Sequence, residues 1–63
     1  MSKSVYETEC EVVHETDEAF LLRIYDDEHW IPKACLANAD DLEVDEDAIA
    51  EIYEWFALER GLI

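Results

Sequence analysis

The chain has 63 residues, and 18 acidic residues against four basic ones give it a formal net charge of −14. This length suits one domain near the lower limit for folding around a hydrophobic core, while an apolar content of 51% excludes a disordered composition. The charge argues against direct binding to nucleic acid or to an anionic membrane, because both attract Lys and Arg, and it favours a positively charged partner.

The first half of the chain is rich in Val, Tyr, Ile, Phe and Thr, which are typical of strands. Its pattern predicts three strands, at residues 6–15, 19–25 and 29–32. Polar clusters at residues 16–18 and 26–28 predict turns that join the strands into an antiparallel meander. Pro32 lacks a backbone N–H, so we expect it at a strand end or on an edge.

Residues 33–44 carry no clear period. They predict one short helical turn around residues 34–37, followed by an acidic loop in which Leu42 and Val44 anchor an extended stretch. No Gly-rich or Ser-rich linker interrupts the chain, so we expect one domain across residues 1–63.

From Asp45 onward, apolar residues recur at three- and four-residue intervals, which predicts a C-terminal helix. Asp45 suits the N-cap, Arg60 falls in the last turn, and Gly61 suits the position just past the helix. Four apolar side chains of this helix are expected to face the sheet: Ile49, Ile52, Tyr53 and Phe56. The expected fold class is α+β, an antiparallel three- to four-stranded sheet with one C-terminal helix packed on one face.

Four glutamates alternate along the first predicted strand, at Glu7, Glu9, Glu11 and Glu15. Residues two apart in a strand project from the same face, about 6.6 to 6.8 Å from one another. Because phosphates along a DNA strand are also regularly placed single charges, a basic groove shaped for the backbone accepts such a row. The alternative is an ordinary solvated strand face whose charge discourages edge-to-edge aggregation.

Further acids lie at the turns, in the acidic loop and at the start of the predicted helix. Turn chemistry and capping account for several of them, but not for the near absence of Lys, since soluble surfaces usually mix both signs. Two explanations stay open: a halophilic host whose salt screens the charge, or imitation of a nucleic acid. In the second, the carboxylates that contact a basic partner are Glu7, Glu9, Glu11, Glu15, Asp26, Asp27, Glu28, Asp40, Asp41, Glu43, Asp45 and Asp47.

The two tryptophans have different expected roles. Trp55 and Leu58 fall toward the flank or the far side of the predicted helix. Trp55 is therefore either a side chain too large for a very small core or an aromatic anchor for the partner. Trp30 follows the second turn and is expected in the core.

Nothing in the sequence supports catalysis, a cofactor or a dedicated metal site. The chain lacks the motifs of nucleotide-binding loops and hydrolases, and residues 40–47 lack the central glycine of an EF-hand. Cys10 with His14, and Cys35 with His29, match no zinc-binding spacing. Without a secretory signal or a membrane-spanning stretch, we expect a soluble, cytoplasmic protein with two reduced, buried cysteines.

The run TDEAFLLRIYDDEHWIPKACL, followed after an acidic spacer by EWFALERGLI, resembles a group of small proteins encoded by phages and mobile elements. The resemblance covers about residues 12–63, and its WIPK stretch is the most distinctive part. The matching positions are Thr16, Asp17, Ala19, Asp26, Trp30, Ile31, Pro32, Lys33, Trp55, Arg60, Gly61 and Leu62. In size and acidity the chain is also similar to small acidic anti-CRISPR proteins that imitate DNA toward type I effector complexes.

The resemblance implies a phage anti-defence protein in the host cytoplasm that blocks the basic groove through which an effector complex contacts DNA or its PAM. The implied partner is a basic nucleic-acid-binding protein, a subunit of a type I CRISPR effector complex, and the chain acts as a monomer or small homo-oligomer. The alternative is a non-enzymatic phage accessory or structural module that binds through Trp55 and its neighbours. Its acidity would then serve solubility or a halophilic host.

Overall fold

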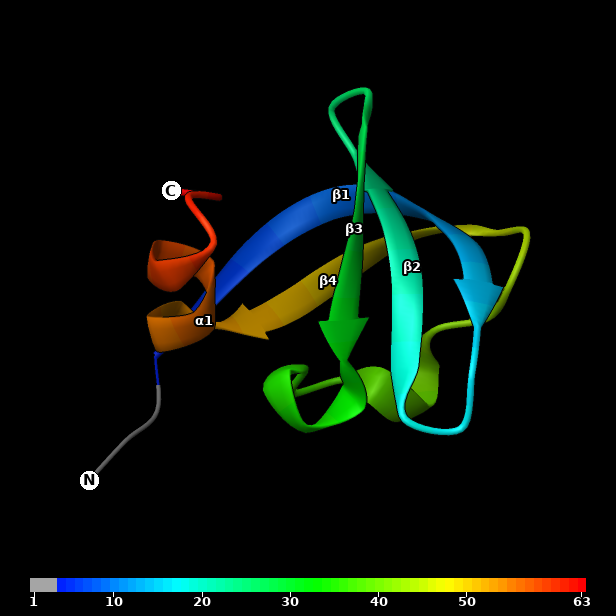
Figure 1. The fold of residues 1–63 in the computed structure, drawn as a ribbon. Coiled ribbons are helices and arrows are strands. Elements are labelled where there is room, and N and C mark those ends of the chain that lie inside the picture. The colour runs from blue at the N-terminus through cyan, green and yellow to red at the C-terminus, as the bar shows by residue number, and fades with distance from the viewer. Residues whose placement is uncertain (1–3) are drawn as a thin grey trace.

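The computed structural model describes residues 4–63, in which four strands form one antiparallel sheet of order β3-β2-β1-β4. The strands are β1 (Val5–Glu15), β2 (Ala19–Ile24), β3 (Asp27–Pro32) and β4 (Asp47–Tyr53). The short 3-10 helices η1 (Lys33–Cys35) and η2 (Ala39–Asp41) and the helix α1 (Glu54–Glu59) complete the elements of this part of the chain. Figure 1 shows the long, curved β1 with α1 beside its beginning. The predicted α+β class is confirmed.

The meander of the first three strands is as predicted, but its second turn lies earlier than expected. Only Tyr25 and Asp26 separate β2 from β3, and both have positive φ, 54° and 83°. Left-handed backbone at both positions is the geometry of two-residue hairpin loops whose twist matches the strands. Asp27 and Glu28 therefore belong to β3, and the turn expected at residues 26–28 is wrong.

The strand β1 serves two neighbours. Residues 5–11 pair with β4, and residues 11–15 pair with β2. The pairing with β2 shifts between Val12 and His14, so Val13 forms a bulge. Because the bulge adds one residue to β1, the side chains after it lie on the opposite face from the one that strict alternation would give them.

The C-terminal helix is much shorter than predicted, because residues 47–53 form β4. In this strand Ala50 and Ile52 are buried and alternate with outward-facing residues such as Ile49. The spacing of these residues fits a helical period and a strand period equally, and pairing with β1 along the whole of β4 decides for the strand. The expectation that Asp45 is a helix N-cap is also wrong, since it has a φ of 70° in the turn before β4.

The end of α1 agrees with the prediction for Gly61. Arg60 is the C-cap, and Gly61 follows with a φ of 74°. The Leu62 N–H donates to the Ala57 carbonyl at 2.8 Å, and the Gly61 N–H donates to the Leu58 carbonyl at 3.2 Å. This pair of bonds is a Schellman motif, whose left-handed residue glycine adopts without strain.

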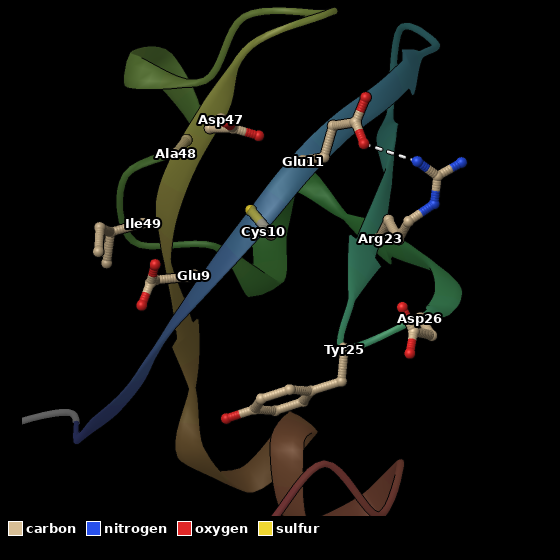
Figure 2. Close-up of a pocket in the computed structure, with 9 residues that line it drawn as sticks. All are labelled: Glu9, Cys10, Glu11, Arg23, Tyr25, Asp26, Asp47, Ala48 and Ile49. Atoms are coloured by element: carbon tan, nitrogen blue, oxygen red, sulfur yellow. Dashed lines mark hydrogen bonds and ion pairs between the residues drawn. The ribbon is translucent and has the colours of Figure 1, made fainter.

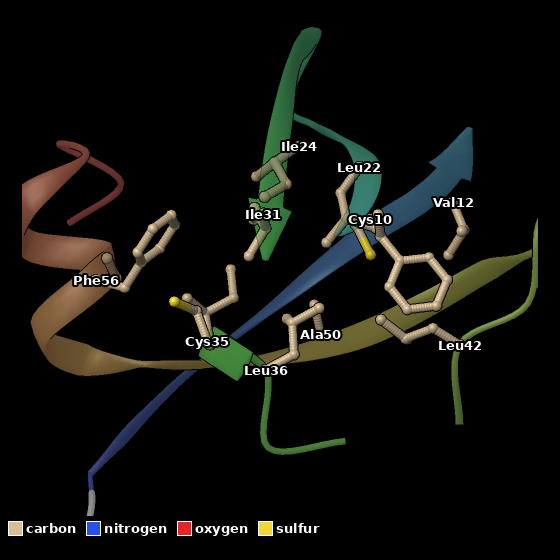
Figure 3. Packing of buried hydrophobic residues seen from close by; sticks show 13 residues of the cluster. Cys10, Val12, Leu22, Ile24, Ile31, Cys35, Leu36, Leu42, Ala50 and Phe56 are labelled. Carbon is tan, nitrogen blue, oxygen red and sulfur yellow. The ribbon is translucent and has the colours of Figure 1, made fainter. Parts of the chain in front are cut away.

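The core lies on one face of the sheet (Figure 3). The segment after β3 closes over this face with Cys35, Leu36 and Leu42, and α1 adds Phe56 and Ala57. The fully buried large side chains are Phe20, Leu22, Ile31, Ile52 and Val12. The two cysteines, Cys10 and Cys35, are free and buried as predicted, and burial raises the pKa of both thiols.

The two edge strands of the sheet, β3 and β4, differ in how their open edges are limited. Pro32 ends the edge strand β3, as the sequence predicts. Along the other edge, Asn38 acts as a substitute strand residue: its Nδ2 donates to the Ile49 carbonyl at 2.8 Å, and its Oδ1 accepts from the Glu51 N–H at 2.9 Å. The Ala37 N–H adds a bond of 2.7 Å to the Glu51 carbonyl. These bonds satisfy part of the β4 edge that would otherwise be open for pairing.

Candidate functional site

The face of the sheet opposite the core, which we call the outer face, is open to solvent. Thr8, Cys10 and Val12 of β1 point into the core. The side chains between them alternate outward, so Glu7, Glu9 and Glu11 share the outer face. The regular row that the sequence suggests thus exists for three of its four members.

Glu15 does not continue this row, and the expectation that it does is wrong. The bulge at Val13 reverses the alternation, so Glu15 pairs with the buried Phe20 and lies on the core side of the sheet. There its Oε2 is 2.6 Å from the Nζ of Lys33. A single bulge residue cannot be recognised from the spacing of the glutamates in the sequence.

A second set of outward residues comes from β4. Glu51 pairs with Glu7, and Asp47 pairs with Glu11. Like charges directly opposite each other on neighbouring strands are destabilising. The sequence pattern missed Glu51 because it assigned this segment to a helix. We call Glu7, Glu9, Glu11, Asp47 and Glu51 the five carboxylates.

Arg23 of β2 is the only basic side chain on the outer face among residues 4–63. Its Nη1 donates to Glu11 at 2.6 Å, and its Nη2 donates to Glu28 at 3.0 Å. Both acids raise the pKa of Arg23, Glu28 through its hydrogen bond and Glu11 through its charge. These exposed pairs add little stability, but they occupy the guanidinium. No ion pair within the described residues involves Glu7, Glu9, Asp47 or Glu51.

The outer face is hollowed beside the hairpin turn (Figure 2). A groove there is lined by Glu9, Glu11, Arg23, Tyr25, Asp26, Asp47 and Ile49, together with Cys10 and Ala48. A second groove adjoins it and is lined by Glu7, Thr8, Glu9, Tyr25 and Ile49. Tyr25 is 81% exposed and Ile49 is 52% exposed, so both present apolar surface to solvent beside the carboxylates.

Sequence reasoning missed both of these residues. Tyr25 was expected to end a strand, and Ile49 was expected to face the sheet from a helix. Small and large residues alternate only from Ala48 to Glu51, and Ile52 and Tyr53 break the pattern, so this signal for β4 and for an outward Ile49 is weak.

The remaining predicted contact acids divide between the outer face and other parts of the molecule. Asp26 borders the first groove, and Glu28 lies on the outer face beside Arg23. Asp27 pairs with the buried Ile24, so it projects to the core side of β3. Four others lie in η2 or between η2 and β4, in the segment that covers the core: Asp40, Asp41, Glu43 and Asp45.

The two tryptophans are both exposed. Trp30 is 46% exposed and meets the ring of His14 edge-on, with centroids 6.1 Å apart, so the expectation that it is a core residue is wrong. Its neighbour Ile31 takes the buried position instead. Trp55 and Leu58, each 59% exposed, lie on α1.

No group of three or more His, Cys, Asp or Glu side chains in residues 4–63 is arranged to hold a metal ion. The same part of the chain contains no helix with the length and apolar character needed to cross a membrane. Comparison with protein-family models, curated proteins and solved structures finds no match to this chain.

Proposed function

We propose that the protein is a non-enzymatic inhibitor that imitates the phosphate backbone of DNA and occupies the basic groove of a nucleic-acid-binding protein. The observation that carries this proposal is the set of five carboxylates on an open sheet face. Arg23 is held by two acids at one end of the set, and Glu7, Glu9, Asp47 and Glu51 are left for the charges of a partner.

The charge density supports the comparison with DNA. Between the pair Glu7 and Glu51 and the pair Glu11 and Asp47, the five carboxylates span four residue steps of β1, about 13 Å. One strand of DNA carries one charge per about 3.4 Å of helix axis, or about five charges over the same length. On β4, Ile49 lies between Asp47 and Glu51 on the outer face, where a sixth carboxylate would complete a row of acids parallel to that of β1.

The resemblance to small acidic anti-CRISPR proteins suggests the target, a basic subunit of a type I effector complex in the cytoplasm of a phage host. The net charge of −14 would steer the protein toward such a surface and speed association. The carboxylates would then take the positions that phosphates occupy in the DNA complex.

Binding to a purified type I effector complex tests this function. We expect the protein to displace target duplex from the complex and its affinity to fall steeply as salt rises from about 50 to 200 mM, as for ligands held by charge. Binding that ignores salt and leaves the duplex bound would contradict the proposal.

The exposed side chains of α1 favour one alternative, an accessory module that binds its partner through Trp55 and Leu58. Replacing both with Ser separates the two functions, because the outer face is left unchanged. Loss of partner binding in this variant supports the accessory module. A domain that unfolds below about 1 M salt would instead indicate that the charge is an adaptation to a halophilic host.

A further inference from the structure

The groove between the hairpin turn and β4 combines side chains of three kinds. The ring of Tyr25 extends from the turn across the outer face (Figure 2). Ile49 supplies an exposed aliphatic surface, and Glu7 and Glu9 supply carboxylates at the same groove. We call these four residues the Tyr25–Ile49 groove.

We propose that the Tyr25–Ile49 groove receives an arginine side chain of a basic partner protein. A guanidinium is planar and stacks on an aromatic face, while its N–H groups match carboxylates in a fork geometry. The aliphatic stem of the same arginine fits against an apolar surface such as Ile49. The proposal rests on the proposed function, because it names the contact by which a basic groove would recognise this face.

The structure favours an arginine from outside the described chain. Arg23 is the nearest candidate, but its guanidinium is held by Glu11 at 2.6 Å and Glu28 at 3.0 Å. Lys33 is bound to Glu15, and Arg60 lies over the Phe56 ring at 4.9 Å. None of these three cations reaches Glu7 or Glu9.

Charge complementarity also selects the class of partner. A second copy of this chain would bring another net charge of −14 to the same surface, and nucleic acid would bring phosphates, so both are repelled. A Lys-rich surface would meet the carboxylates but would lack the planar group that stacks on Tyr25. Tyr and Arg are among the residues most enriched at the positions that contribute most to binding energy in protein interfaces.

A titration of ¹⁵N-labelled protein with an acetylated Gly-Arg-Gly-Arg-Gly amide tests the groove by NMR. We expect the largest shifts at Tyr25, Ile49 and Glu9. The Tyr25→Asn variant should bind the peptide about two- to five-fold more weakly, the loss typical of an exposed cation–π contact. Asn accepts the left-handed φ of 54° at this position, so the turn is kept while the ring is removed.

Two controls make the result specific. Trp55→Ser removes another exposed aromatic side chain, from α1, and should leave the affinity for the peptide unchanged. The corresponding Lys peptide should bind more weakly than the Arg peptide. Three outcomes would each overturn the proposal. The first is equal peptide affinity of the Tyr25→Asn variant and the unaltered protein, and the second is equal affinity of the protein for the Arg and Lys peptides. The third is NMR shifts that are as large at Asp40 and Asp41 as at Tyr25.

The peptide experiment needs no effector complex, so its outcome does not depend on whether the protein displaces DNA. Peptide binding that depends on Tyr25, in a protein that does not displace DNA, leaves the arginine site standing and removes DNA mimicry. Displacement of DNA together with peptide binding that ignores Tyr25→Asn keeps mimicry and removes the arginine site.

Discussion

The two faces of the sheet are built from alternate residues of the same strands, yet they differ in almost every property. On the core face, Cys10 and Val12 of β1 meet the buried side chains of β2 and β4. On the outer face, Glu7, Glu9 and Glu11 of the same strand meet solvent and further acids. Stability therefore resides mainly on one face and the proposed binding on the other, so the two can be changed separately.

The largest expected effect on stability comes from substituting two isoleucines of β4, one on each face of the sheet. Ile52 is fully buried and Ile49 is 52% exposed. Ile52→Ala should lower the free energy of unfolding by about 2 to 5 kcal/mol, because it removes packed methyl groups from the core. Ile49→Ala, the matched control, should change it by less than about 0.5 kcal/mol.

Urea or thermal unfolding of both variants measures the difference. Similar losses in the two variants would show that the outer face is packed against something, and the contrast between the faces would fail.

The hairpin turn provides the next effect. Asp26 has a φ of 83°, a conformation that glycine adopts at much lower cost than other residues. Asp26→Gly should raise the free energy of unfolding by about 1 kcal/mol, which for a domain of this size raises Tm by about 4 to 8 °C. Calorimetry checks the shift. A lower Tm in this variant would mean that the Asp26 side chain stabilises the turn.

The like-charged pair on the outer face gives a smaller effect. Glu51→Lys places a cation opposite Glu7 and should stabilise the protein by about 0.2 to 1 kcal/mol at low salt, with less gain as salt is added. Asp40→Lys changes the net charge equally in η2 and serves as the control. If both variants gain the same stability, general self-repulsion and not the pair of strands is responsible.

The smallest expected effect concerns the core-face thiols. Burial raises the pKa of Cys10 and Cys35, so less thiolate is present at neutral pH than for a free cysteine. A thiol reagent should react slowly with the folded protein and rapidly in denaturant. Because the raised pKa favours the protonated thiol in the folded state, this contribution to stability is present below the ordinary thiol pKa and is lost as pH rises through the folded-state value. Rapid labelling of either thiol in the folded protein would contradict its burial.

The contrast between the faces also explains what could be predicted from the sequence. The meander, the strand-end position of Pro32 and the role of Gly61 all depend on local patterns or on single residues with strict backbone preferences. These features were predictable because no distant partner decides them.

The incorrect predictions concern residues whose structure depends on pairing with a strand that is distant in the sequence. The segment that contains Ile49 and Ile52 satisfies two periods, and only the free edge of β1 makes it a strand. With that strand undetected, Glu51 and Ile49 could not be placed on the outer face. A single bulge residue, Val13, likewise turned Glu15 away from the row.

The most direct test of the account exchanges charge on one face at a time. A triple variant with Glu7, Glu9 and Asp47 changed to Lys reverses outer-face acids that form no ion pair among the described residues. A second triple variant, with Asp40, Asp41 and Glu43 changed to Lys, alters the net charge equally in the segment that covers the core.

Displacement of target duplex from the effector complex is then measured for both variants, once NMR spectra show that each is folded. We predict that the outer-face variant loses more than about ten-fold in affinity for the complex, as expected when several interface charges are reversed, whereas the second variant displaces the duplex nearly as well as the unaltered protein. Equal losses in the two variants, or no loss in either, would contradict the assignment of binding to the outer face.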